Sequence, residues 1–164
     1  MTRFAPDLAK VKAGLRTLSA GEWELIIGKP QPIYYVKEDT GKEVAGCRVS
    51  FTIEGEIKAD GSLDEEFKGD GVFGIRLYVH SEKAFGMTKQ FLLAAFGYSI
   101  DEEDQANEDI FADSDFSVDV DDDENGVLGE GWFALEGNRV RATASTSIYN
   151  DRESQDWKAF VPVK

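Results

Sequence analysis

Three segments have the period-two pattern of β-strands, residues 44–53, 72–80 and 139–149. In each of them, every arginine has the parity opposite to that of most apolar residues. In each segment most apolar residues share one parity, which predicts a buried face and turns the other parity outward. In the middle segment the inward set is Phe73, Ile75, Leu77 and Val79. The outward residues with charged, aromatic or imidazole groups are Arg48, Arg76, Arg139 and Arg141, with Tyr78, His80 and Tyr149.

No aspartate or glutamate shares the outward parity in these three segments. Guanidinium groups neutralise phosphates and flat rings stack on bases, so this pattern is typical of proteins that bind single-stranded nucleic acid. Arginines also occur on exposed strands simply because they keep sheets soluble. Three further residues extend the predicted interface: Arg152 in a turn over 150–154, Trp157 in the last strand and Tyr35.

The adjacent Tyr34 and Tyr35 lie in a segment that we expect to be a loop joining the first two strands. Loops at this place in small barrels often hold a ligand. The two rings would equally well fill an open end of the barrel, and the sequence does not separate these alternatives.

Negative charge is concentrated in one part of the chain. The 164 residues carry 32 acidic and 18 basic side chains, but residues 90–138 hold 15 of the acids and no lysine or arginine. The acidic segment, residues 101–136, therefore interrupts a nearly neutral remainder. Such a segment is most often a solvated surface. It is also suited to a cation site, to a basic partner, or to competition with nucleic acid for the arginines.

One part of the acidic segment resembles the first half of a calcium-binding loop. Asp121, Asp123 and Asn125 alternate before Gly126, which is the ligand spacing that such loops use. The twelfth position, where a bidentate glutamate would close the site, is Trp132. The sequence thus predicts at most weak calcium or magnesium binding and favours an acidic hairpin turn over a metal site, and no other cofactor is expected.

The chain offers little for catalysis. It has one histidine, His80, and one cysteine, Cys47, which excludes histidine-pair metal motifs and multi-cysteine zinc sites. Cys47 has the inward parity of its strand and is expected to be a small buried residue. The glycine pattern over 69–74 follows a charged loop and precedes a strand, unlike a dinucleotide-binding turn. We expect a non-enzymatic protein.

No apolar run approaches the ~18 residues that cross a bilayer, and residues 1–6 lack the apolar core of a signal peptide. We therefore expect a cytoplasmic protein without a membrane partner.

The element order predicts one mainly β domain over residues 1–164. Residues 1–20 suggest a short helix or an ordered arm. Strands are expected over 22–27, 44–53, 72–80, 139–149 and 157–163, with one helix over 82–96 that Ser81 caps and Gly97 ends. Five strands with a helix between the third and the fourth is the order of an OB-type barrel. The acidic segment is then an insertion, mostly loop, with a hairpin at Asn125-Gly126.

Four short landmarks resemble a bacteriophage family, catalogued as a domain of unknown function, of OB-fold single-stranded-DNA-binding proteins. They are Leu18–Leu25, the helix end Phe91–Gly97, Leu135–Arg141 and Trp157–Pro162. The resemblance implies a non-catalytic protein of phage replication or recombination, acting in the cytoplasm of a bacterial host. The acidic residues of 101–130 and the length of 54–70 depart from the family pattern.

Two functions therefore follow from the sequence. In the first, the outward arginines and rings bind single-stranded DNA, while the acidic segment contacts replication or recombination proteins. In the second, the acidic segment mimics nucleic acid and inhibits a DNA-binding protein. A protein that only mimics nucleic acid has no need of the outward arginines, so these residues distinguish the two functions.

Overall fold

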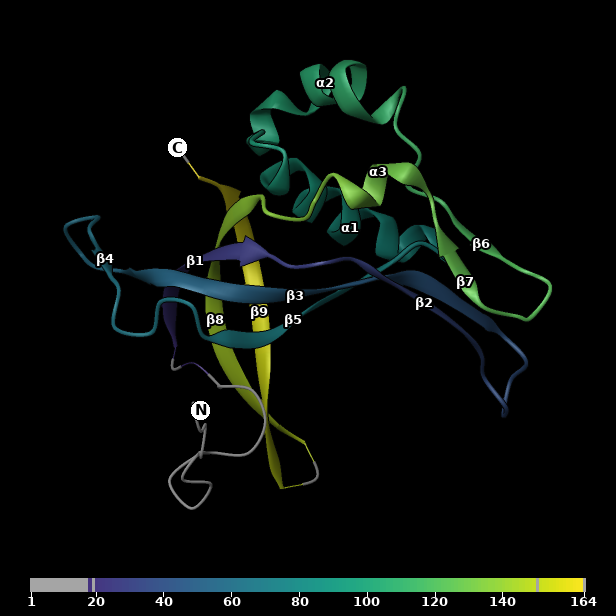
Figure 1. Ribbon diagram of the computed structural model, residues 1–164, viewed down its shortest axis with the longest axis horizontal. Coiled ribbons are helices and arrows are strands. Elements are labelled where there is room, and N and C mark those ends of the chain that lie inside the picture. The colour runs from purple at the N-terminus through teal and green to yellow at the C-terminus, as the bar shows by residue number, and fades with distance from the viewer. Residues whose placement is uncertain (1–17, 19, 150, 164) are drawn as a thin grey trace, which may run out of the picture.

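Antiparallel strand pairing organises this chain around one long strand (Figure 1). The computed structural model describes Leu18, residues 20–149 and residues 151–163, apart from the side chains of Tyr149, Arg152 and Glu153. Most of the predicted N-terminal arm, residues 1–20, lies outside the described residues. The strands are β1 (Gly21–Ile27), β2 (Gln31–Val36), β3 (Glu43–Ile57), β4 (Leu63–Asp64), β5 (Gly71–Tyr78), β6 (Val118–Val120), β7 (Gly126–Leu128), β8 (Arg139–Tyr149) and β9 (Arg152–Pro162). The helices are α1 (Glu82–Ala95), the 3-10 helix η1 (Ile100–Glu102), α2 (Glu103–Ala106), the π-helix η2 (Asn107–Phe111) and α3 (Glu130–Phe133).

Strand β3 is hydrogen-bonded along both edges. One edge pairs with β2 and then with β1, and the other pairs with β5 and the short β4. Beyond β1 the sheet continues to β8 and β9. The outer strands β5 and β9 are linked by the Trp157 indole N–H, which donates to the Phe73 carbonyl oxygen at 2.7 Å. No ladder joins β5 to β9 within the described residues, so the mainly β, antiparallel class is confirmed, while the OB-type barrel stays a prediction.

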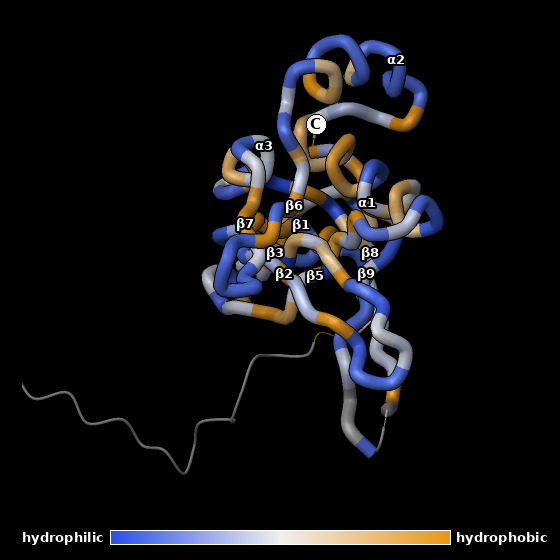
Figure 2. The backbone as a smooth tube through the Cα atoms, turned by 90° about the vertical axis from the view of Figure 1, so that its right-hand side faces the viewer, coloured by the Kyte–Doolittle hydropathy of each residue, from blue (hydrophilic) through white to orange (hydrophobic). Residues whose placement is uncertain are grey.

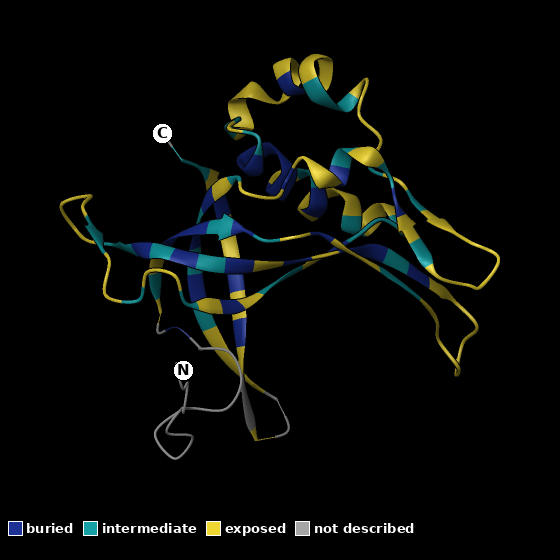
Figure 3. Cartoon of the chain, in the orientation of Figure 1, coloured by how far each residue is buried: buried dark blue, intermediate teal, exposed yellow. Residues whose placement is uncertain are grey.

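The apolar core lies between the sheet and helix α1. Along β3 the inward parity is buried as predicted, from Cys47 through Val49 and Phe51 to Ile53. The Phe51 ring meets Trp157 edge-on at 5.6 Å between ring centroids, and Phe91 of α1 meets Phe160 at 4.9 Å. Figure 2 shows apolar stretches gathered where the strands and α1 meet, and Figure 3 shows buried and exposed bands alternating along the strands. The alternation of apolar and polar residues in the sequence therefore corresponds to the buried and exposed faces of the strands.

Helix α1 begins and ends close to the predicted limits. Gly97 follows it with φ +87°, a conformation that glycine adopts without steric cost. Ser81 stands at the N-cap position, but its side chain makes no capping hydrogen bond, contrary to the prediction. The Thr88 hydroxyl instead ties the helix to the sheet by donating to the Tyr78 carbonyl oxygen at 2.8 Å.

The first two strands are not joined by a simple loop, because residues 31–36 form β2. Its run Ile33, Tyr34, Tyr35 and Val36 favours a strand, whereas Pro30 and Pro32 favoured a break. Pro32 is accommodated because β2 lies at an edge, where a missing N–H removes no ladder bond on the open side. The last strand also starts earlier than predicted, at Arg152 rather than Trp157.

A β-bulge reverses the predicted parity at the start of β5. Val49 pairs with Ile75 and Phe51 with Val72, so Phe73 and Gly74 together stand opposite Ser50. Val72 is consequently buried, and Phe73 is 54% exposed rather than inside. The cause is close backbone approach: a Cβ on Gly74 would lie 1.7 Å from the Val49 carbonyl oxygen.

The acidic segment is folded rather than mostly loop. The predicted hairpin is present as β6 and β7, but three short helical elements over 100–111 and α3 were not predicted. A small aromatic cluster holds the segment against α1: Phe116 lies 5.3 Å from Trp132 and 6.1 Å from Phe96, between ring centroids. These rings are scattered along the chain, so periodicity did not reveal them.

None of the helices in the described part of the chain is long and apolar enough to cross a membrane.

Two glycine substitutions test the bulge. Gly74→Ala should destabilise the protein by about 2–3 kcal/mol, because the added carbon meets backbone that must move. Gly86→Ala, in the middle of α1 with open space around its Cβ, should stabilise it by about 0.5–1 kcal/mol. Urea unfolding followed by circular dichroism measures both. If Gly74→Ala were neutral, the bulge would not be fixed by this contact.

Candidate nucleic-acid interface

Two of the predicted arginines lie side by side on one face of the sheet. Arg48 of β3 stands directly opposite Gln31 of β2 on one edge and Arg76 of β5 on the other. In the next row, Gly46 stands opposite Ile33 and Tyr78. Directly opposite residues of a ladder point to the same side of a sheet. We call this surface the basic face; it comprises Lys29, Gln31, Ser50 and Phe73 with Arg48, Arg76 and Tyr78.

A hollow of about 370 Å³ opens in the basic face beside the β5 bulge. Its walls are polar or basic at Lys29, Gln31, Arg48 and Ser50, and aromatic at Phe73. The bulge turns the Phe73 ring to this surface, and Gly74 has no side chain to fill the space. Lys29, Gln31 and Phe73 were missed by sequence reasoning. Gly74 was the available signal, because a glycine inside a strand pattern often marks a bulge.

The charge of the basic face is not balanced by neighbouring acids. The Arg48 guanidinium donates to the Gln31 side-chain oxygen, and in the described part of the chain neither Arg48 nor Arg76 forms an ion pair with a carboxylate. The outward rows of β2, β3 and β5 around these arginines contain no aspartate or glutamate. Like charges directly opposite each other in a sheet are destabilising. The basic face therefore carries positive charge that no carboxylate of the described residues pairs with.

The two adjacent tyrosines separate onto opposite sides of β2. Tyr35 stands opposite Val44, two positions along from the Ile33 and Gly46 row, and is exposed on the side of the basic face. Tyr34 points to the other side, and its hydroxyl donates to Glu43 Oε1 at 2.9 Å, a bond that raises the pKa of Tyr34. Tyr78 packs edge-on against His80 at 5.4 Å between ring centroids. Tyr35 and Tyr78 therefore lie on the side of the basic face, whereas Tyr34 lies on the other side of β2.

The other two arginines lie on β8 and are paired with carboxylates. Arg141 Nε donates to Glu24 Oε1 at 3.2 Å, and Glu24 is only 3% exposed. Arg139 Nη2 lies 3.7 Å from Glu54 Oε2. The prediction that all four arginines share one carboxylate-free surface is therefore wrong. The prediction compared outward residues only on the strands that became β3, β5 and β8. Strand β1 lies between β3 and β8 and places Glu24 directly opposite Arg141.

The remaining predicted contacts lie elsewhere. Trp157 is buried in the core against Phe51, so its ring is not open to a base. The side chains of Tyr149 and Arg152 lie outside the described residues, although their backbones pair with each other where β8 turns into β9.

The β6–β7 hairpin of the acidic segment packs on the side of β2 opposite the basic face. A Cβ on Gly126, at the start of β7, would lie 3.0 Å from the Pro32 Cβ and 3.2 Å from the Tyr34 Cβ. The β6–β7 hairpin therefore packs on the even-numbered side chains of β2, whereas Gln31 of the basic face belongs to the odd-numbered set. The hairpin does not cover the arginines, so it leaves the basic face open.

The calcium-like loop is used as a turn. Asp121 Oδ1 accepts hydrogen bonds from the backbone N–H groups of Asp123 and Asn125, at 3.0 and 2.9 Å. Within the described residues no three histidine, cysteine, aspartate or glutamate side chains are grouped so that they could hold a metal ion. Cys47 is buried as predicted, and burial raises the pKa of its thiol to about 12, which leaves it unreactive at neutral pH.

No protein-family model and no curated protein matches the sequence. The function is therefore inferred from the residues of this chain itself.

Arg141 and Arg139 make a matched test of which arginines are structural. Arg141→Gln should cost about 2–3 kcal/mol of folding free energy, because it leaves the buried Glu24 carboxylate without its charged partner. Arg139→Gln should cost less than about 1 kcal/mol, since its guanidinium is half exposed and its carboxylate more distant. Urea unfolding of both variants at neutral pH gives the comparison. Equal losses would contradict a structural role specific to Arg141.

Proposed function

We propose that this protein binds single-stranded DNA on the basic face and catalyses no reaction. The observation that carries the proposal is the pairing of Arg48 with Arg76 directly across β3 and β5, where neither forms an ion pair with a carboxylate of the described residues. Like charges directly opposite each other in a ladder are destabilising when the face is empty. A phosphate backbone passing over them removes that repulsion and gains two charge-assisted contacts.

Aromatic side chains on the same face supply the second part of the interaction. Phe73 borders the hollow beside Arg48, and Tyr78 lies one row from Arg76. A base stacked on such a ring contributes about 1–3 kcal/mol, without strong preference for its identity. Tyr35 extends the ring surface along β2. Phosphates on the arginines and bases on the rings account for binding without sequence readout.

The strand order supports an OB-type domain. In chain order the five core strands are β1, β3, β5, β8 and β9, with α1 between the third and the fourth. In the sheet they are neighbours in the order β5, β3, β1, β8 and β9. OB-folds bind oligonucleotides on their second and third strands and on the loops that join strands one to two and four to five. Here these are β3 and β5, the connection containing β2, and the turn between Tyr149 and Arg152. The position of the basic face on β3 and β5 supports the proposal, because these strands correspond to the second and third strands of an OB-type domain.

We extend the proposal to the phage type of single-stranded-DNA-binding protein, acting in replication or recombination, on the strength of the sequence landmarks alone. The acidic segment, whose β6–β7 hairpin packs on the other side of β2, is then free to contact other proteins of the same process. The alternative, in which that segment mimics nucleic acid, predicts no affinity for oligonucleotides and capture of a basic protein instead.

Oligonucleotide binding tests the proposal directly. Fluorescein-labelled oligothymidine of about 20 nucleotides should raise its fluorescence anisotropy with micromolar protein at ~20 mM salt, where phosphate contacts are strongest. Arg76→Gln should weaken binding roughly five- to tenfold and reduce the salt slope by about 0.7, the value for one phosphate on a single strand. Arg139→Gln, whose guanidinium is near Glu54, is the matched control and should bind like the wild type. Absence of binding by the wild-type protein at low salt would overturn the proposal.

The repulsion between Arg48 and Arg76 predicts opposite effects on stability and binding. Without DNA, Arg76→Gln should stabilise the protein by a few tenths to about 1 kcal/mol, because it removes the like charge opposite Arg48. With saturating oligothymidine the wild type should become the more stable of the two proteins, since it binds the oligonucleotide more tightly. Thermal unfolding with and without oligonucleotide measures both. A variant that is less stable in both conditions would show that Arg76 is structural.

A further inference from the structure

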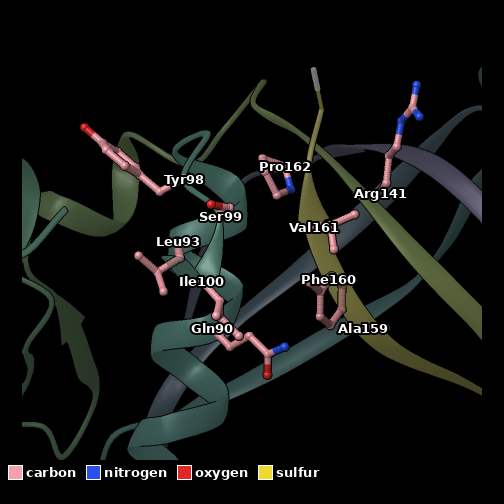
Figure 4. A pocket seen from close by; sticks show the side chains of 10 residues that line it. All are labelled: Gln90, Leu93, Tyr98, Ser99, Ile100, Arg141, Ala159, Phe160, Val161 and Pro162. Carbon is pink, nitrogen blue, oxygen red and sulfur yellow. The ribbon is translucent and has the colours of Figure 1, made fainter. Parts of the chain in front are cut away.

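A second hollow, of about 450 Å³, lies between helix α1 and the end of strand β9 (Figure 4). We call it the α1–β9 groove. Its apolar walls come from three parts of the chain: Leu93 of α1, Ile100 of η1, and Phe160, Val161 and Pro162 of β9. Figure 4 shows Leu93 and Ile100 on one side and the β9 residues on the other, with the Arg141 guanidinium directed away from the opening. None of these residues belongs to the basic face.

The groove leaves apolar side chains in solvent. Ile100 is 64% exposed and Val161 is 48% exposed, although both stand beside the buried Phe160. A bulge shapes the β9 wall: Arg141 pairs with Val161 and Thr143 with Lys158, and Ala159 adopts φ +55°. A left-handed conformation at a residue with a side chain costs about 1 kcal/mol or more. The chain thus maintains a strained backbone at an open apolar surface.

Acidic residues follow the groove residue Ile100 directly in the chain. The residues that follow Ile100 are Asp101, Glu102, Glu103 and Asp104, all exposed. The nearby positive charges are already engaged, because Lys89 Nζ lies 2.7 Å from Glu103 Oε1 and Arg141 contacts Glu24. A nucleic acid would be repelled here, and an apolar segment with basic residues would be attracted.

We infer that the α1–β9 groove binds a short segment of a partner protein in which apolar side chains are flanked by lysine or arginine. The apolar side chains fill the space between Leu93, Ile100 and Val161, and the basic ones face Asp101 and Asp104. This binding is independent of the proposed function, because the groove and the basic face share no residue. The protein therefore has separate surfaces for a nucleic acid and for a basic protein.

Labelled peptides test this inference. Three fluorescein-labelled peptides of about ten residues are compared: one of leucine, phenylalanine and lysine, one with glutamate in place of lysine, and one with glycine in place of the apolar residues. Only the first should bind at micromolar concentration, in moderate salt of ~0.1 M that limits long-range attraction to about 10 Å. Ile100→Ser should weaken its binding roughly tenfold, since an exposed apolar contact is lost without disturbing the core.

Val127→Ser is the matched control. Val127 lies on β7 in the same acidic segment, is exposed to 47%, and does not line the groove, so its loss should leave peptide binding unchanged. Ile100→Ser should leave oligothymidine binding unchanged, which separates this inference from the proposed function. Equal binding of the glycine-lysine peptide would mean attraction by charge alone and would overturn the inference, as would no binding of the first peptide. Self-association of the wild type that Ile100→Ser abolishes would assign the groove to a second copy of the chain and overturn a partner protein as its occupant.

Discussion

Pairing of β3 along both of its edges is the constraint on which the rest of this structure depends. Its 15 residues hydrogen-bond to β2 and β1 on one side and to β5 and β4 on the other, so every neighbour inherits its register and its two faces. The inward set from Cys47 to Ile53 builds the core with α1 and β9. The outward set, from Gly46 to Ser50, places Arg48 between Gln31 and Arg76. One strand thereby determines both what is buried and where unbalanced positive charge appears.

The basic face and the acidic hairpin lie on different sides of β2. The β6–β7 hairpin of the acidic segment packs on the even-numbered side of β2, while the basic face occupies the odd-numbered side. A protein with a formal net charge of −14 can therefore present a local surface that attracts phosphate. The same separation explains why the α1–β9 groove, which adjoins the acidic residues, suits a basic segment rather than DNA.

Much of the fold could be predicted because local patterns specify local structure. Alternation located β1, β3, β5 and β8, the stripe before Gly97 located α1, and Asn125-Gly126 located the β6–β7 hairpin. Local patterns failed where backbone geometry was decided by a neighbour. Pro30 and Pro32 concealed β2, which forms because β3 offers it an edge, and Phe73 faces outward because Gly74 allows β5 to bulge against Val49. Of the candidate site, Arg48, Arg76 and Tyr78 were predicted, whereas Lys29, Gln31 and Phe73 were not.

The sequence alone determined most of the core-facing side chains of β3, because side chains alternate along a strand wherever no bulge interrupts it. It did not determine the start of β5, where the bulge turns Phe73 outward. It also determined that 15 of the 32 acidic residues fall within residues 90–138, which hold no lysine or arginine. Tertiary structure decided which arginines pair with a carboxylate. Arg141 and Glu24 are 117 positions apart and meet only because β1 lies between β3 and β8. Charge pairing acts through space over a few ångströms, so the strand order, and not the spacing of residues, left Arg48 and Arg76 without a carboxylate and gave one to Arg139 and Arg141.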